Sequence, residues 1–176
     1  MSNKNISILF TGQGSQHENM GMELMESMEW VKDRYNQSSD ILGYDVIKTQ
    51  QNSDKINLTQ YSQPLIFIYS SILIDLFKKS FKKIISENNI SLAGHSLGEY
   101  LALYFSESLD FESMLKVVSL RGNSMANVSD PNKFGMFAIL TKEKINPEIF
   151  PENVFLANIN SDSQVVICGL KKDLEN

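Results

Sequence analysis

Two short apolar runs that each lead into a glycine-containing turn constrain the fold of this chain more than any other feature. Residues 6–10, ISILF, end at the loop TGQGSQ, and residues 90–94, ISLAG, lead into HSLGEYLALYF. Both runs are typical of buried β-strands, and an amphipathic helical pattern begins directly after the second turn. Strands that pass through such turns into helices build parallel sheets, so we expect an α/β fold.

Apolar spacing and proline predict the helices before the second strand. Residues 19–42 carry apolar side chains three or four positions apart, at Met20, Leu24, Met28 and Val31, which indicates a helix. Ser62 is expected to cap a helix that Pro64 opens, because proline needs no N–H in the first turn. We expect this helix to run to about residue 78.

A helix over LGEYLALYF should follow the second strand at once, and a further helix should come after it, with Asp110 as its cap. Its apolar face would consist of four residues, Phe111, Met114, Leu115 and Val118. These elements complete a strand and helix order that is typical of layers around a parallel sheet.

The character of the chain changes near residue 128. The polar connection NVSDPNKFG leads to an expected strand at 136–140 and to a helix-like segment, TKEKINPEIF, that Pro147 limits. Two strands follow, VFLANIN and QVVICG, separated by the turn residues SDS, and KKDLEN resembles the first turn of a helix. We expect one part at 1–128 and a smaller β-α-β-β-α unit at 129–176.

Charge and cysteine content exclude several classes of function. The net charge is −5 and the basic residues are scattered, whereas a nucleic-acid-binding face needs clustered Lys and Arg. The single cysteine, Cys168, cannot form an intrachain disulfide, which fits the cytoplasm or the reducing stroma of an organelle. The apolar run PLIFIYSSILIDLF is too short to span a bilayer and contains Asp75, and there is no Cys/His cluster with metal-ligand spacing.

The turn after the second strand has the G-x-S-x-G pattern, formed by Gly94, Ser96 and Gly98. Between a strand and a helix this pattern is typical of a nucleophile elbow, in which a strained serine presents its hydroxyl at the sheet edge. The Leu97 N–H and the helix dipole could stabilise the oxyanion that forms when the serine attacks a carbonyl. The alternative is a serine that only caps the helix.

The first glycine-rich loop, TGQGSQ, would open at the same sheet edge if the two strands are parallel. The N–H of Gln13, which lies between two glycines, is then well suited to be a second oxyanion donor. A plain turn and a phosphate-binding loop are the alternatives. The phosphate-binding loop is weakly supported, because the P-loop lysine is absent and G-x-G-x-x-G is incomplete.

Six segments together resemble one family. They are FTGQGSQ at 10–16, SQP at 62–64, LAGHSLGEYLAL at 92–103, LRGNSM at 120–125, GMFAIL at 135–140 and NINSDSQVVICG at 158–169. In this order and spacing they resemble the malonyl-CoA:acyl-carrier-protein transacylases and the acyltransferase domains of fatty acid and polyketide synthases. The resemblance implies an α/β-hydrolase-like large subdomain with an inserted ferredoxin-like small subdomain, both incomplete here.

The resemblance also implies a transferase mechanism. Ser96 would accept a malonyl group from coenzyme A and pass it to the phosphopantetheine thiol of an acyl carrier protein, with no covalently bound cofactor. Gln13 and Leu97 would form the oxyanion hole through their N–H groups. Arg121 would bind the free malonyl carboxylate, because a guanidinium can donate two parallel hydrogen bonds to it; a surface salt bridge is the alternative.

Three further residues match the family at the wall of the site. His95 is expected to support the elbow, because a neighbour of Ser96 on a sharp turn need not face its hydroxyl. Asn158 and Asn160 match family positions in the small subdomain that border the cleft. His17 is the only other histidine, and we expect it to be a solvent-facing loop residue.

The general base of the family is missing from these 176 residues. It is a histidine in a Ser-x-Pro-x-His segment beyond the small subdomain, so a second chain or a C-terminal continuation would have to supply it. We therefore expect a fragment, a truncated product or one half of a split enzyme, inactive or nearly so alone. A carrier-protein-docking or synthase-docking subunit without catalysis and a serine thioesterase remain alternatives.

Overall fold

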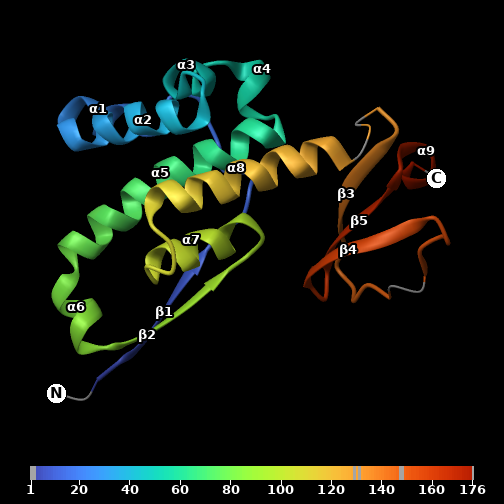
Figure 1. The fold of residues 1–176 in the computed structure, drawn as a ribbon. Helices are drawn as coiled ribbons and strands as arrows, with labels where there is room; N and C mark the ends of the chain where they lie inside the picture. The colour runs from blue at the N-terminus through green and yellow to red at the C-terminus, as the bar shows by residue number, and fades with distance from the viewer. Residues whose placement is uncertain (1–2, 129, 131, 147–148, 176) are drawn as a thin grey trace. The chain divides into compact units, whose positions relative to one another are not determined.

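The computed structural model describes residues 3–128, 130, 132–146 and 149–175. The chain divides into a large unit, Met1–Ala126, and a small unit, Asn127–Asn176, close to the expected boundary at 128. Figure 1 shows the order of their helices and strands. The large unit holds both glycine-rich loops of the sequence.

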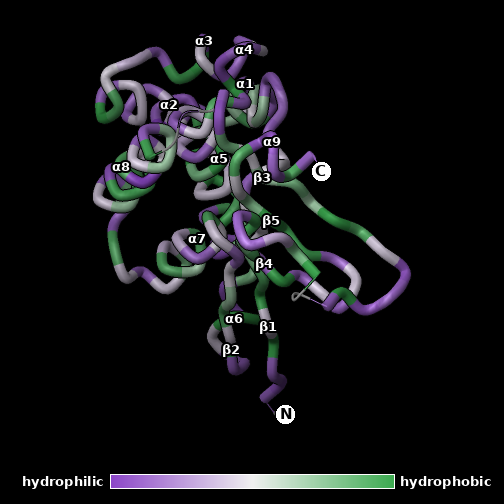
Figure 2. Tube along the Cα trace, turned by 90° about the vertical axis from the view of Figure 1, so that its right-hand side faces the viewer, coloured by the Kyte–Doolittle hydropathy of each residue, from purple (hydrophilic) through white to green (hydrophobic). Residues whose placement is uncertain are grey.

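The two strands of the large unit are parallel, as the sequence predicts. β1 (Asn5–Phe10) pairs with β2 (Asn89–Gly94) along its whole length, from Asn5 opposite Asn89 to Phe10 opposite Gly94. Figure 2 shows the change from hydrophilic to hydrophobic residues on entering β1. Because the strands end at the same level, the loops that follow them open at one edge of the sheet.

One face of this sheet packs on helices and the other is open within the described chain. Ile8 and Phe10 of β1 and Leu92 of β2 pack against the hydrophobic core. On the opposite face Leu9 is 73% exposed. Parallel sheets are ordinarily covered on both faces, so this face is unusual for a complete α/β domain.

Eight helices form the rest of the large unit as the structure describes it. They are α1 (Met22–Ser27), α2 (Glu29–Leu42), α3 (Val46–Gln50), α4 (Ser53–Ile56), α5 (Thr59–Ser80), α6 (Lys82–Glu87), α7 (Leu97–Phe105) and α8 (Phe111–Val128). The helix expected over 19–42 is interrupted at Met28, which has extended dihedral angles. None of the described helices is both long and apolar enough to cross a bilayer.

The start of α5 differs from the prediction. The helix begins at Thr59 and contains Pro64 in its second turn, where proline cannot donate to the Gln60 carbonyl and its ring crowds that carbonyl. Ser62 does not cap the helix, because it lies inside it, is fully buried, and accepts a hydrogen bond from Gln13. The apolar contacts of α5 with the core stabilise the extra turn.

The prediction for α8 is confirmed. The backbone N–H of Ser113 donates to Asp110 Oδ1 at 2.8 Å, and this hydrogen bond lowers the pKa of the Asp110 carboxyl. All four residues of the expected apolar face are buried: Phe111, Met114, Leu115 and Val118. The Phe111 ring stacks on Phe67 of α5 with 5.8 Å between centroids, so the cap fixes the start of α8 and the stack packs it against α5.

The small unit is an antiparallel sheet in the order β3-β5-β4, formed by β3 (Phe134–Leu140), β4 (Val154–Ser161) and β5 (Gln164–Leu170). A short helix, α9 (Lys171–Leu174), follows as expected. Its core consists of Ile145, Val154, Val165 and Ile167. The three strands agree with the sequence prediction.

The helix expected over 141–150 is wrong for residues 141–146, which form a loop. The Thr141 hydroxyl bonds the backbone of Glu143, and the Ile145 N–H donates to the Asp162 carbonyl at 2.8 Å. Side-chain bonds of this kind compete with helical hydrogen bonds. Pro147 lies outside the described residues.

Two glycines allow α7 to follow β2 without a clash. A Cβ atom on Gly94 would lie 2.1 Å from the carbonyl carbon of Gly98. A Cβ on Gly98 would lie 2.1 Å from the Phe10 carbonyl oxygen at the end of β1. Only a residue without a side chain permits this close approach of helix and strand.

Gly98→Ala should therefore lower the free energy of unfolding by more than about 3 kcal/mol, because backbone atoms cannot move aside as a side chain can. In an ordinary helix the same change raises stability by about 0.5–1 kcal/mol. Urea titration checks this, with Gly43→Ala as the control. Gly43 has φ 74° and no atom near its Cβ, so only backbone strain of about 1–2 kcal/mol is expected there. Equal stability of Gly98→Ala and the wild type would contradict the proposed close packing.

Candidate active site

Ser96 occupies the turn between β2 and α7 in a strained conformation. Its dihedral angles are φ 53° and ψ −112°, and its side chain makes no capping hydrogen bond to the helix. An ordinary capping serine has extended angles and bonds the first turn, whereas this region is one that glycine favours. The side chain is exposed, so the turn presents the hydroxyl at the sheet edge rather than using it for the helix.

The first glycine-rich loop lies against this turn. A Cβ atom on Gly12 would lie 3.0 Å from the His95 carbonyl oxygen and 3.6 Å from Ser96 Cβ. Gln13, the next residue, anchors its side chain by donating from Nε2 to Ser62 Oγ at 2.7 Å. The structure thus brings Gln13 and Ser96 together at one edge.

Leu97 is the first residue of α7 and is fully buried. The N–H groups of a first helical turn have no acceptor within the helix, and they carry the positive end of the helix dipole. The Leu97 N–H directly follows Ser96 at this helix start, and the loop that contains Gln13 lies against the same turn. The expected roles of both residues as oxyanion donors stay predictions.

Arg121 of α8 reaches Ser96 directly. Its Nη2 donates to Ser96 Oγ at 2.9 Å, and its Nη1 donates to Gln63 Oε1. The guanidinium also lies over the Tyr100 ring, 5.5 Å from the centroid. Arg121 therefore places a positive charge beside the hydroxyl, where a bound carboxylate could meet it.

Neither histidine is placed as a partner of the serine hydroxyl. The Nδ1 atom of His95 faces Gly12, 3.3 Å from where a Cβ would be. His17 lies with Nδ1 3.3 Å from the Ser15 carbonyl oxygen, beside a hollow that Met22 and Tyr69 also line. The described residues around Ser96 thus include a hydroxyl and a cation, but no side chain placed to accept the serine proton.

Asn158 and Asn160 belong to β4 of the small unit. Asn158 is half-buried opposite Val166, between two register shifts of the strand, and Asn160 is exposed. Their expected place at the wall of the cleft stays a prediction.

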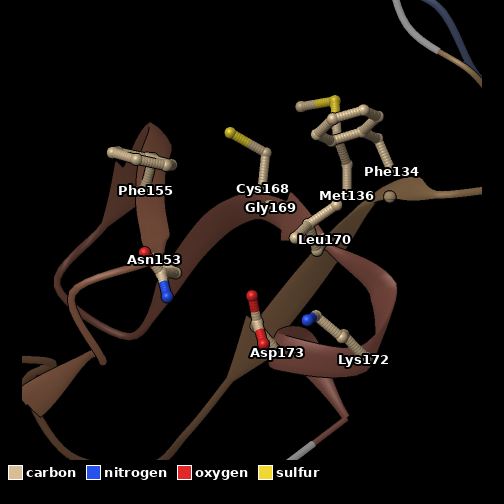
Figure 3. Close-up of a pocket in the computed structure, with 10 residues that line it drawn as sticks. Phe134, Met136, Asn153, Phe155, Cys168, Gly169, Leu170, Lys172 and Asp173 are labelled. Atoms are coloured by element: carbon tan, nitrogen blue, oxygen red, sulfur yellow. The ribbon is translucent and has the colours of Figure 1, made fainter.

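The small unit also contains a hollow of about 660 Å³, and none of the candidate site residues discussed above lines it. Figure 3 shows Phe134, Met136, Phe155 and Cys168 projecting to one side of the sheet, with Asp173 carried by α9 on the other. This lining is mainly apolar. The residues that line the hollow include no serine and no histidine.

Gln63 and Tyr100 are the two site residues that sequence reasoning missed. Both contact the guanidinium of Arg121. The signal for Gln63 was present in the SQP segment, where two polar residues precede a long apolar run. Tyr100 gave no separate signal, because an aromatic residue on an amphipathic helix is usually part of the core.

The strain at Ser96 predicts an unusual response to substitution. Ser96→Gly should raise the free energy of unfolding above the wild type by about 1 kcal/mol, since glycine adopts these angles without strain. Ser96→Ala should change it by less than about 0.5 kcal/mol, because no capping bond is lost and water can replace the exposed hydrogen bond from Arg121. Chemical denaturation of the three proteins checks this. Two variants that are both less stable than the wild type would instead indicate an ordinary capping serine.

Comparisons with known proteins identify the family of the chain. A model of the family described as acyl transferase domain matches residues 8–176. A malonyl CoA-acyl carrier protein transacylase of Synechocystis is 39% identical over 173 residues, which are 95% of this chain and 55% of the relative. The polyketide biosynthesis malonyl CoA-acyl carrier protein transacylase PksC of Bacillus subtilis is 33% identical, over 97% of this chain and 58% of its own length.

Solved structures agree with the sequence matches. One is a malonyl-transacylase in complex with its type II polyketide acyl carrier protein; it has a TM-score of 0.76 and 28% identity, over 98% of this chain and 57% of that chain. The present chain thus spans a little over half the length of the curated relatives it matches. Because the family model covers nearly all of the chain, and the fold matches as well, the chain belongs to the acyl transferase domain family.

Proposed function

We propose that this chain carries the residues for moving a malonyl group from coenzyme A to the phosphopantetheine thiol of an acyl carrier protein. The observation that carries the proposal is the hydrogen bond of 2.9 Å between Arg121 Nη2 and Ser96 Oγ. It puts a cation for the malonyl carboxylate beside a strained serine. The relatives named as malonyl transacylases, one of them bound to a carrier protein, support the same substrate and partner.

The fold assignment that goes with this function has two parts. Residues 1–128 are the N-terminal part of an α/β-hydrolase-like large subdomain, supported by the parallel pair β1-β2 and the helices on one of its faces. Residues 129–176 are a truncated ferredoxin-like small subdomain, supported by the antiparallel order β3-β5-β4 with α9 at its end. The family resemblance implies roles at the wall of the site for His95, Asn158 and Asn160.

The reaction has two halves. Ser96 Oγ attacks the thioester carbonyl, the N–H groups of Gln13 and Leu97 stabilise the oxyanion, and coenzyme A leaves as its thiol. The carrier-protein thiol then attacks the malonyl-serine ester, which forms the new thioester and restores the hydroxyl. Arg121 holds the malonyl carboxylate in both halves.

Each half needs a proton acceptor that the described site lacks. The guanidinium of Arg121 has only donors, and the two histidines do not face the serine hydroxyl. We propose that a further segment or a second chain supplies this base. The open face of β1-β2 around Leu9 supports this, because such sheets are normally covered on both sides.

Labelling with radioactive malonyl-CoA tests the assignment. We expect slow formation of an ester that hydroxylamine cleaves, faster labelling when imidazole is added as an external base, and loss of the label in Ser96→Ala. The rate without imidazole should be lower by orders of magnitude than in an enzyme with its base. Incubation with holo carrier protein should then remove the label as malonyl thioester.

Other outcomes separate the alternatives. Label that persists in Ser96→Ala would refute Ser96 as the nucleophile. Carrier-protein binding without any labelling, even with imidazole, would support a docking subunit instead. Release of free malonate in preference to transfer would support a thioesterase.

A further inference from the structure

Two consecutive polar side chains, Ser62 and Gln63, are fully buried in the first turns of α5. The residues that follow them, from Pro64 to Ile68, are buried as well. An amide or hydroxyl in such surroundings is costly unless it is hydrogen-bonded. Their partners therefore indicate why polar residues are placed there.

Both partners belong to the candidate active site. Ser62 Oγ accepts from Gln13 Nε2 at 2.7 Å, and Gln63 Oε1 accepts from Arg121 Nη1. The other end of the Gln63 amide donates from Nε2 to Met125 Sδ at 3.2 Å. The amide is thus held at both ends, which fixes the oxygen that Arg121 contacts.

Gly122 explains how Arg121 comes so close to α5. A Cβ atom on Gly122 would lie 3.0 Å from the Thr59 carbonyl oxygen and 3.3 Å from Gln60 Cα. The absence of a side chain there lets α8 pack closely on the first turn of α5. The residue before Gly122 is Arg121, so its side chain leaves α8 beside the buried amide.

The acceptor of Arg121 is neutral. Among the residues that the structure describes, Arg121 takes part in no ion pair, and its contacts are the Gln63 amide, the Ser96 hydroxyl and the Tyr100 ring. An acidic residue in place of Gln63 would compensate the positive charge within the protein. A neutral amide orients the guanidinium and leaves its charge for a ligand.

The donors also suffice for a ligand. A guanidinium has five N–H donors, of which Gln63 and Ser96 use one each. The remaining donors can bind both oxygens of a carboxylate while the contact to Gln63 is kept.

We propose that Gln63 is a positioning residue that makes the site selective for acyl groups with a free carboxylate. It holds Arg121 by one nitrogen and leaves the charge uncompensated. This inference rests on the proposed role of Arg121 toward the malonyl group. The selectivity arises because only an acyl group with a carboxylate can form an ion pair with the Arg121 guanidinium. A neutral acyl group gains no binding free energy from this charge.

Equilibrium binding of malonyl-CoA and acetyl-CoA, measured by titration calorimetry, tests the proposal without needing turnover. Gln63→Glu keeps the size of the side chain and adds a charge. It should weaken malonyl-CoA binding by about tenfold or more, because like charges then oppose each other. Acetyl-CoA binding should change by less than about twofold, since that ligand has no carboxylate to be repelled.

Gln37→Glu is the matched control, because it makes the same charge change on an exposed position of α2. It should leave both affinities as in the wild type. Gln63→Leu removes the acceptor without adding charge and provides a second test if Gln63→Glu does not fold. It should lower the preference for malonyl-CoA over acetyl-CoA, whereas a loss that is equal for both ligands would overturn the proposal.

The side-chain NMR signal of Arg121 Nε–Hε gives a readout that is independent of substrate. Gln63→Leu should shift it and speed its exchange with water, and an unchanged signal would overturn the positioning role. A wild-type chain that binds both ligands equally, with an Arg121 signal that responds to Gln63→Leu, would refute the proposed function and confirm only the contact. A wild-type preference for malonyl-CoA that Gln63→Glu leaves intact would refute the inference alone.

Discussion

The in-register parallel pairing of β1 and β2 is the constraint on which the candidate site depends. Phe10 lies opposite Gly94, so both strands release the chain at the same level. A slip of one residue would turn every side chain of a strand to the other face and would separate the two loops. The close approach of Gly98 to the Phe10 carbonyl packs α7 against the end of the neighbouring strand. Ser96 lies in the short turn between β2 and α7 that this packing requires, and its backbone is strained there.

A second layer of contacts fixes the side chains around the serine. Ser62 and Gln63 of α5 each bond one site residue, Gln13 in the first loop and Arg121 on α8. Because both polar residues are fully buried, these bonds cannot be exchanged for water at no cost. The stability of α5 and the geometry of the site are therefore linked, since the helix that forms much of the core also orients the polar groups at its N-terminal end.

The contact between Arg121 and Ser96 bears on two separate tasks of the proposed acyl transfer. A guanidinium can orient the hydroxyl and bind an anion, but it cannot accept a proton. The described residues place no such acceptor at the hydroxyl, and the matched relatives are almost twice as long as this chain. The open face of β1-β2 is consistent with additional chain in that part of the fold.

The sequence alone determined the elements whose signals are local. Alternating or periodic apolar residues marked β1, β2, α7 and α8, and the cap at Asp110 followed from the chemistry of one side chain. It misplaced the start of α5, because Pro64 is a frequent first-turn residue and the local pattern could not show that packing against the core stabilises an earlier start. It also overestimated the helix after residue 140, where bonds from Thr141 and to the distant Asp162 compete with helical ones.

For the site, the sequence identified Ser96, Gln13 and Arg121 as candidates through glycine spacing and a family resemblance. Only the tertiary structure decided that Ser96 does not cap its helix, that Arg121 bonds its hydroxyl, and that Gln63 holds the arginine. The physical reason is the range of the interactions. Periodicity and capping act over a few neighbouring residues, whereas the contact of Gln63 with Arg121 joins two helices, and no local pattern encodes which polar side chains meet when those helices pack.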